Sequence, residues 1–392
     1  MSKHNVLTIP PELTEHIALL ADPEDLLSLR LVNREASQRI EQVYIKAYFT
    51  ECAFLLCYTE SLATLLAIVE HDKYGASLER IVICVDQVSH PEQQCRLAPG
   101  AKKDRRSKAH KAHVAAYAAQ TFMQQDNIDI ALLTLIFTRL RQHANVQEIT
   151  ITDIDTMYNH EPLAWGYNTF REEIGDGYTE YNEDESRPVR LILDALVTAQ
   201  LPVSKFEVNI LDGEIPMSSI VATPRDFNNT RSVFRNLTVL SLQVRIDEAA
   251  TTVHYKRLAS AIGDATGLQE LHLDAGRDWE DTERAGHVLI PRRILRHRFP
   301  SLKTLNLSGF VLDCQQLIAF LSRHRQLERV FFDLGHFFNT GDSANMEDGR
   351  ASDVEELLKK RTGLSWISLY QCETLRAEKM VFDEIGETEP ED

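Results

Sequence analysis

The sequence is poor in the features that mark secreted and membrane-spanning proteins. Its six cysteines are scattered, without the spacing of a disulfide framework, which favours a reducing compartment. The first residues, MSKHNVLTIPPEL, contain no apolar signal core, and the apolar runs are too short or too interrupted to span a bilayer. We therefore expect a cytoplasmic or nuclear protein with no membrane partner.

Positive charge is also scarce. The chain has 42 lysines and arginines against 59 aspartates and glutamates, a formal net charge of −17. A protein that binds nucleic acid needs a basic surface to neutralise phosphates. The acidic balance therefore argues against a nucleic-acid partner.

Motifs of known catalytic chemistry are missing as well. The chain has no Gly-x-Ser-x-Gly, no phosphate-binding loop and no dinucleotide fingerprint, and no Ser, His and Asp grouping stands out. We expect no catalytic residues, no cofactor and no metal, although an α/β enzyme without a known motif stays an alternative. Two groups of potential metal ligands lack the usual spacing or context: His90, Cys95, His110 and His113, and Glu148, Asp153 and Asp155.

The stretch IPPELTEHIALLADPEDLLSLRLVNRE, residues 9–35, predicts short amphipathic helices. Pro10 and Pro11 suit a helix start, and Asp22 and Pro23 suit the next one. Asn33 suits the cap of a third helix. The apolar stripes expected on the three helices are Leu13, Ile17 and Leu20, then Leu26, Leu29 and Val32, and then Ala36, Ile40, Val43 and Ala47.

The second of these helices has apolar residues on two faces. Leu27 and Leu31 form a row of their own beside the stripe that begins at Leu26. Three helices in about forty residues are too few to bury both faces without help. Either the rest of the chain covers this row or a partner does.

The segment from Leu7 to Lys46 resembles an F-box, in the form common in fungal proteins. The resemblance is carried by the opening IPPEL, the central DPEDLL and the closing LRLVNR. It implies that residues 1–48 dock on a Skp-family adaptor and through it on a cullin. The chain would then be the non-catalytic substrate receptor of an SCF-type E3 ubiquitin ligase. The adaptor-binding residues implied or chosen on this basis are Ile9, Pro10, Leu13, Ile17, Leu27 and Leu31.

Beyond residue 48 one short pattern recurs: apolar, two residues, apolar, one residue, apolar. It begins at Leu78, Val146, Leu237, Leu268, Leu302, Leu327 and Leu364, with a weaker copy at Val203. Helix-like segments lie between the copies, and strand plus helix at a period near thirty is typical of leucine-rich repeats. We expect an α/β fold: a short three-helix head, then an irregular leucine-rich-repeat-like solenoid, or horseshoe, over residues 49–375.

A doubly wound sheet is the competing α/β architecture. It needs central strands that are apolar on both faces. The strands here are expected to alternate, as in LQELHLD, where Glu270, His272 and Asp274 face away from the leucines.

Two polar stretches, near 87–109 and 159–186, are expected to be insertions in loop form, and residues 376–392 an acidic tail. The first insertion holds the basic run 102–108, which is either a nuclear-import signal or simply a solvated loop.

In a horseshoe, the polar residues between the strand leucines line the concave face, where such proteins bind other proteins. Aromatic residues are the best anchors of an interface. The target-binding candidates are His272, Asp274, Asn306, Phe331, Trp366 and Tyr370. The alternative is a scaffold outside any ligase, whose helical head packs on its own repeats and buries Leu27 and Leu31.

Overall fold

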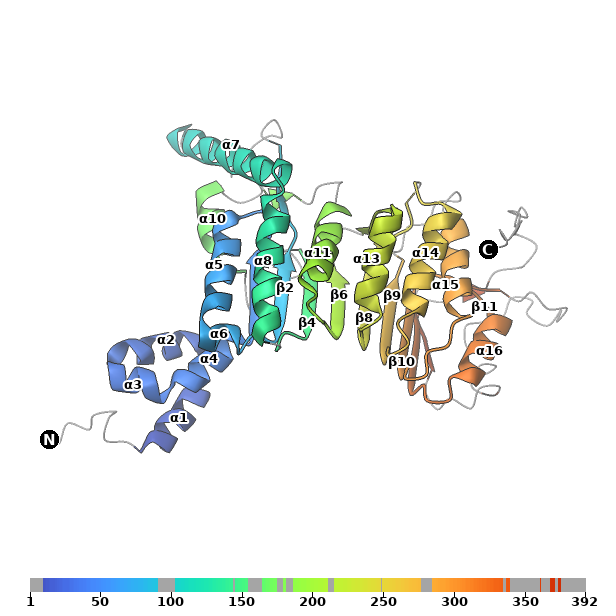
Figure 1. The fold of residues 1–392 in the computed structure, drawn as a ribbon, viewed down its shortest axis with the longest axis horizontal. Coiled ribbons are helices and arrows are strands. Elements are labelled where there is room, and N and C mark those ends of the chain that lie inside the picture. The colour runs from blue at the N-terminus through green and yellow to red at the C-terminus, as the bar shows by residue number, and fades with distance from the viewer. Residues whose placement is uncertain are drawn as a thin grey trace. The chain divides into compact units, whose positions relative to one another are not determined.

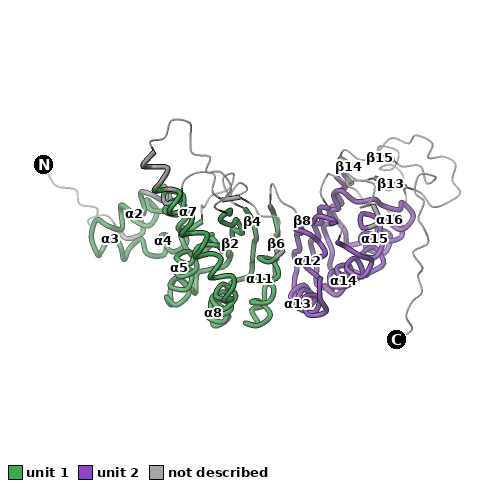
Figure 2. Tube along the Cα trace, turned by 90° about the horizontal axis from the view of Figure 1, so that it is seen from above, with its two compact units in different colours: residues 1–213 green, residues 214–392 purple. Residues whose placement is uncertain are grey.

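The computed structural model divides the chain into two compact units, residues 1–213 and 214–392 (Figure 2), and each is described by itself. The structure describes residues 10–90, 103–143, 145–153, 164–174, 179–180, 186–210, 215–247, 249–275, 284–333, 336–338, 360, 367–370 and 373–374.

The first unit begins with a helical head. Its small core is formed by Ala18, Leu26, Ile40 and Val43. As predicted, Asn33 caps the third helix, because its Oδ1 accepts a hydrogen bond of 2.8 Å from the Ala36 N–H. That helix ends earlier than predicted, and a separate helix follows Ile40. The four helices are α1 (Pro11–Leu19), α2 (Pro23–Val32), α3 (Arg34–Arg39) and α4 (Glu41–Phe49).

A parallel sheet follows the head in the first unit, with strand order β1-β2-β4-β6. Helices α5, α8 and α11 lie on one face of it (Figure 1). The strands are β1 (Glu51–Leu55), β2 (Arg80–Cys84), β4 (Glu148–Thr152) and β6 (Lys205–Asn209). The helices are α5 (Thr59–Glu70), α6 (Asp72–Gly75), α7 (Lys103–Gln125), α8 (Ile128–His143), α10 (Tyr167–Ile174) and α11 (Ser186–Ala199). A short antiparallel pair joins β3 (Gln87–Val88) and β5 (Thr179–Glu180).

The second unit repeats this plan with the parallel strand order β8-β9-β10-β12-β14. The strands are β8 (Val239–Arg245), β9 (Glu270–Asp274), β10 (Thr304–Ser308), β12 (Arg329–Asp333) and β14 (Ile367–Tyr370), with β7 (Ile215–Pro216) beside β8. A second parallel ladder is formed by β11 (Val311–Asp313), β13 (His336–Phe338) and β15 (Glu373–Thr374). The helices are α12 (Met217–Ile220), α13 (Pro224–Phe234), α14 (Thr252–Gly263), α15 (Arg284–Ile294) and α16 (Cys314–Arg323).

The recurring sequence pattern sets the register of both sheets. The third residue of each copy pairs with the third residue of the next, as Arg80 does with Glu148 and Glu148 with Lys205. In the second unit Glu270 pairs with Thr304 in the same way. The predicted α/β fold with aligned repeat strands is therefore confirmed within each unit.

The expected alternation of buried and exposed residues is wrong for the first three strands. Ala53 and Val82 point away from the helix-covered face and are nevertheless buried. Thr150 and Thr152 on β4 are buried as well. In the second unit the alternation holds on β9, where Glu270, His272 and Asp274 are half-buried between buried leucines.

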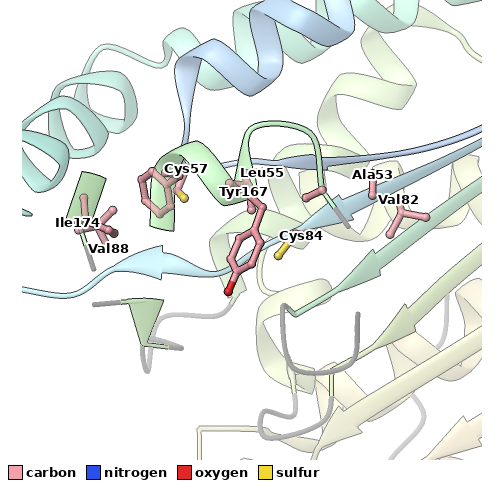
Figure 3. Packing of buried hydrophobic residues seen from close by; sticks show 10 residues of the cluster. Ala53, Leu55, Cys57, Val82, Cys84, Val88, Tyr167 and Ile174 are labelled. Carbon is pink, nitrogen blue, oxygen red and sulfur yellow. The ribbon is translucent and has the colours of Figure 1, made fainter. Parts of the chain in front are cut away.

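Helix α10 explains the burial on β1 and β2, because it packs against this second face of those two strands. Figure 3 shows Tyr167 beside Leu55 and Cys84, and Ile174 beside Val88, and all five residues belong to one apolar cluster. The Trp165 N–H donates a hydrogen bond of 2.7 Å to the Ala53 carbonyl, and Trp165 forms a parallel bridge with Phe54. The prediction of a loop over 159–186 is therefore wrong for the α10 segment.

The first predicted insertion, 87–109, also contains regular structure. Strand β3 lies at its start, and α7 begins at Lys103, within the basic run. The predicted tail, 376–392, lies outside the described residues.

Candidate binding surfaces

The head exposes large apolar side chains. Leu13 and Ile17 on α1 are 53% and 49% exposed, and Leu27 and Leu31 on α2 are 42% and 85% exposed. Leu19, Leu20 and Val32 are also exposed. Water contact with so many apolar side chains is unfavourable, and such surfaces mark interaction sites.

The packing of the head explains why these side chains are outside. The first helix turns its small residues inward: Ala18 is fully buried, and Thr14 is buried with its hydroxyl donating to the Pro10 carbonyl at 3.2 Å. The predicted stripe Leu13, Ile17 and Leu20 is exposed on the outer side of α1. Of the other predicted adaptor contacts, Pro10 is exposed and Ile9 lies outside the described residues.

A cation and aromatic rings join the head to helix α6 of the first unit. Arg30 on α2 donates from Nη2 to the Tyr74 hydroxyl at 3.1 Å, and its guanidinium carbon lies 4.1 Å from the centre of the Tyr44 ring. Tyr74 also stacks on Phe49, with ring centres 4.1 Å apart. The hydrogen bond to Tyr74 is the main cause that raises the pKa of the Arg30 guanidinium. No local sequence signal indicated this joint, because Arg30 and Tyr74 are 44 residues apart.

In the second unit, the sheet face opposite the buried leucines is called the second face. It brings together four of the predicted target-binding residues. His272, Asn306 and Phe331 are direct neighbours on β9, β10 and β12. Asp274 occupies the next row, where Ser308 and Asp333 follow it. Tyr370 pairs with Asp333 through the backbone, and Trp366 lies outside the described residues.

The corresponding face of the first unit carries an ion-pair ladder. Glu148 accepts from Arg80 at 2.8 Å and from Lys205 at 2.7 Å, while Arg80 also contacts Glu51 at 3.1 Å. Burial alone would lower the pKa of Lys205, but Glu148 and Glu207 raise it. The Glu148 carboxylate is thus shared by two cations of this ladder, Arg80 and Lys205.

The described residues contain no group of three or more metal-ligating side chains. His113 is one of the potential metal ligands noted in the sequence. Its side chain is buried, and its Nε2 lies 2.8 Å from the Ser89 carbonyl oxygen. Cys95 and Asp155 lie outside the described residues.

The described cysteines are buried thiols. Burial raises the pKa of Cys52, Cys57 and Cys314 to about 12. Cys84 donates from its Sγ to Asp86 Oδ2 at 2.9 Å, and burial is the first cause that raises its pKa. Thiols so protonated are poor nucleophiles, which agrees with the structural role expected for Cys52 and Cys57.

We compared the sequence with protein-family models and with curated protein sequences. No protein-family model matches the sequence, and no curated protein sequence matches it either. Within the part of the chain that the structure describes, no helix combines the length and apolar character needed to cross a membrane.

Proposed function

We propose that this protein is an F-box protein, the substrate-recognition subunit of an SCF-type E3 ubiquitin ligase. The observation that carries the proposal is the exposure of Leu13, Ile17, Leu27 and Leu31 on a head whose core is formed by other residues. We chose these four residues from the sequence as apolar adaptor contacts beside Ile9 and Pro10, which the F-box resemblance itself implies. In this proposal the exposed apolar side chains contact a Skp-family adaptor, which links the chain to a cullin.

The rest of the chain acts as a leucine-rich-repeat-like solenoid that holds the target protein. Two features support this architecture: the aligned parallel strands, and the short ladder whose strands β11, β13 and β15 follow β10, β12 and β14. The protein performs no bond chemistry itself. It raises the effective concentration of a target lysine near the ubiquitin-loaded partner of the ligase.

We place the protein in the cytoplasm, the nucleus or both. Ubiquitin ligases of this class act there, and the buried free thiols Cys52, Cys57, Cys84 and Cys314 suit a reducing compartment.

The test is co-purification of the full chain with a Skp-family adaptor. A Leu27→Asp, Leu31→Asp double variant places charges on the exposed row and should lose at least about tenfold in adaptor affinity. The matched control is Val114→Asp, Phe122→Asp on α7, which alters two apolar residues of comparable exposure away from the head. Circular dichroism checks that all variants are folded.

Capture by the wild type and by the α7 control, but not by the head variant, supports the ligase assignment. A non-ligase scaffold instead predicts that the wild type does not bind the adaptor. In that case unfolding of the head variant would show that Leu27 and Leu31 belong to a core.

A further inference from the structure

Two side-chain oxygens on the second face of the second unit lack hydrogen-bond donors. Asn306 Oδ1 on β10 and Asp333 Oδ1 on β12 have no partner among the described residues. Both side chains are half-buried. A carboxylate withdrawn from water without a counter-charge is unfavourable, so Asp333 favours a cation from outside this unit.

In the next row of side chains on this face, formed by Glu270, Thr304 and Arg329, another oxygen lacks a hydrogen-bond donor. Thr304 is 2% exposed, and its Oγ1 has no hydrogen-bond partner among the residues that the structure describes. Its side chain lies on the same face, between Glu270 and Arg329, whose carboxylate and guanidinium approach to 3.6 Å. Arg329 is thus paired with Glu270, and no described lysine or arginine forms an ion pair with Asp333.

An aromatic residue neighbours both Asn306 and Asp333 on this face. Phe331 is the direct neighbour of Asn306 and precedes Asp333 by two residues, so all three side chains share one face of the sheet. A guanidinium has five donors and no acceptor, and its plane stacks on aromatic rings. Lysine offers a compact ammonium that is more strongly hydrated, and a metal ion would need more ligands than these two oxygens.

We propose that the target protein is bound through an arginine side chain received by Asn306, Phe331 and Asp333. The guanidinium donates to the two unpartnered oxygens and stacks on the Phe331 ring. The His272 and Asp274 side chains on β9 border this site and contact the residues that flank the arginine. The inference rests on the proposed function only in calling the bound protein a target of the ligase.

The probe is a set of short fluorescent peptides with a central arginine, flanked by mixtures of uncharged amino acids. Two matched sets carry citrulline or lysine at the centre. Citrulline keeps the shape of arginine and loses its charge. The full chain is immobilised, and retention of each set is measured for the wild type, Asn306→Leu, Asp333→Asn and Glu328→Gln. The last variant is the control, because it removes one exposed carboxylate from the position just before β12.

We expect the wild type to retain the arginine set about tenfold better than the citrulline set, and better than the lysine set. Asn306→Leu and Asp333→Asn should abolish that preference, and Glu328→Gln should keep it. Equal retention of arginine and citrulline peptides overturns the proposal, and so does a preference that Asp333→Asn leaves intact. Stronger retention of the lysine set would also overturn it.

Adaptor capture is measured on the same preparation, so the two proposals fail separately. Arginine-selective retention without adaptor capture keeps this site and removes the ligase assignment. Adaptor capture without arginine selectivity keeps the ligase assignment and removes the arginine site.

Discussion

Arg30 donates a hydrogen bond to the hydroxyl of Tyr74 at 3.1 Å and thereby ties α2 of the head to α6 beside the sheet. The same guanidinium lies over Tyr44, and Tyr74 stacks on Phe49 at the end of α4. These contacts connect α2, α4 and α6 and involve none of the exposed leucines Leu13, Leu27 and Leu31. The head is therefore held in a defined position on the first unit while its apolar side chains stay outside.

Removal of the Tyr74 hydroxyl should weaken this joint. In Tyr74→Phe the ring still stacks on Phe49, so only the hydrogen bond from Arg30 is lost. We expect the free energy of unfolding to fall by about 1 kcal/mol in urea denaturation. Lys73→Met is the control, because it removes an exposed ion pair with Glu41 worth only about 0.5 kcal/mol. Equal effects of the two variants would show that the hydroxyl is not needed for the joint.

Neutralising Asp129 should destabilise the first unit strongly. Asp129 is 1% exposed and accepts from Arg187 Nη2 at 3.0 Å and from the Ile130 N–H at 2.8 Å. Asp129→Asn leaves the Arg187 guanidinium on α11 without its carboxylate, at a cost of about 3 kcal/mol. Thermal unfolding followed by circular dichroism measures it. Asp126→Asn, an exposed change three residues earlier, should be nearly neutral.

The ion-pair ladder predicts unequal effects for two glutamates on one face. Glu148 contacts both Arg80 and Lys205, whereas Glu207 forms an ion pair only with Lys205 among the described residues. In urea denaturation, Glu148→Gln should cost about 1–2 kcal/mol and Glu207→Gln less than about 0.5 kcal/mol. A larger loss for Glu207→Gln would contradict the ladder.

Acid should destabilise the second unit through His324. Its Nδ1 lies 2.7 Å from the Phe320 carbonyl and its Nε2 accepts from the Phe299 N–H at 2.9 Å, which fixes a neutral tautomer. Burial lowers the pKa of His324. The unfolded chain therefore binds this proton first, near pH 6.5, so stability is complete above about pH 6.5 and falls as the pH drops below it.

The measurement is the free energy of unfolding at neutral and mildly acidic pH for the wild type and His324→Gln. Other histidines titrate in both proteins, so the difference between them isolates His324. The wild type should lose more stability on acidification than the variant. Parallel pH profiles would show that His324 is not the responsible group.

The repeat pattern predicted the sheets well, because each copy must place its leucines in one core. The sequence pattern did not predict contacts between segments that are far apart in the chain. The apolar spacing of Tyr167, Phe170 and Ile174 within a polar stretch was a helical signal that could have located α10. The pairing of Arg30 with Tyr74 had no local signal. The site around Asn306 and Asp333 was predictable only in part, since aligned strands bring the two residues together but do not show which oxygens lack donors.

A parallel sheet built one repeat at a time begins with a strand whose outer backbone groups have no neighbour of the same kind. Such an edge is a template on which another chain can add a strand and start a filament. In this protein Trp165 occupies the outer side of β1 by its bridge to Phe54 and its hydrogen bond to the Ala53 carbonyl. The segment that sequence patterns suggested was a loop thus terminates the sheet and blocks strand addition between molecules at this edge.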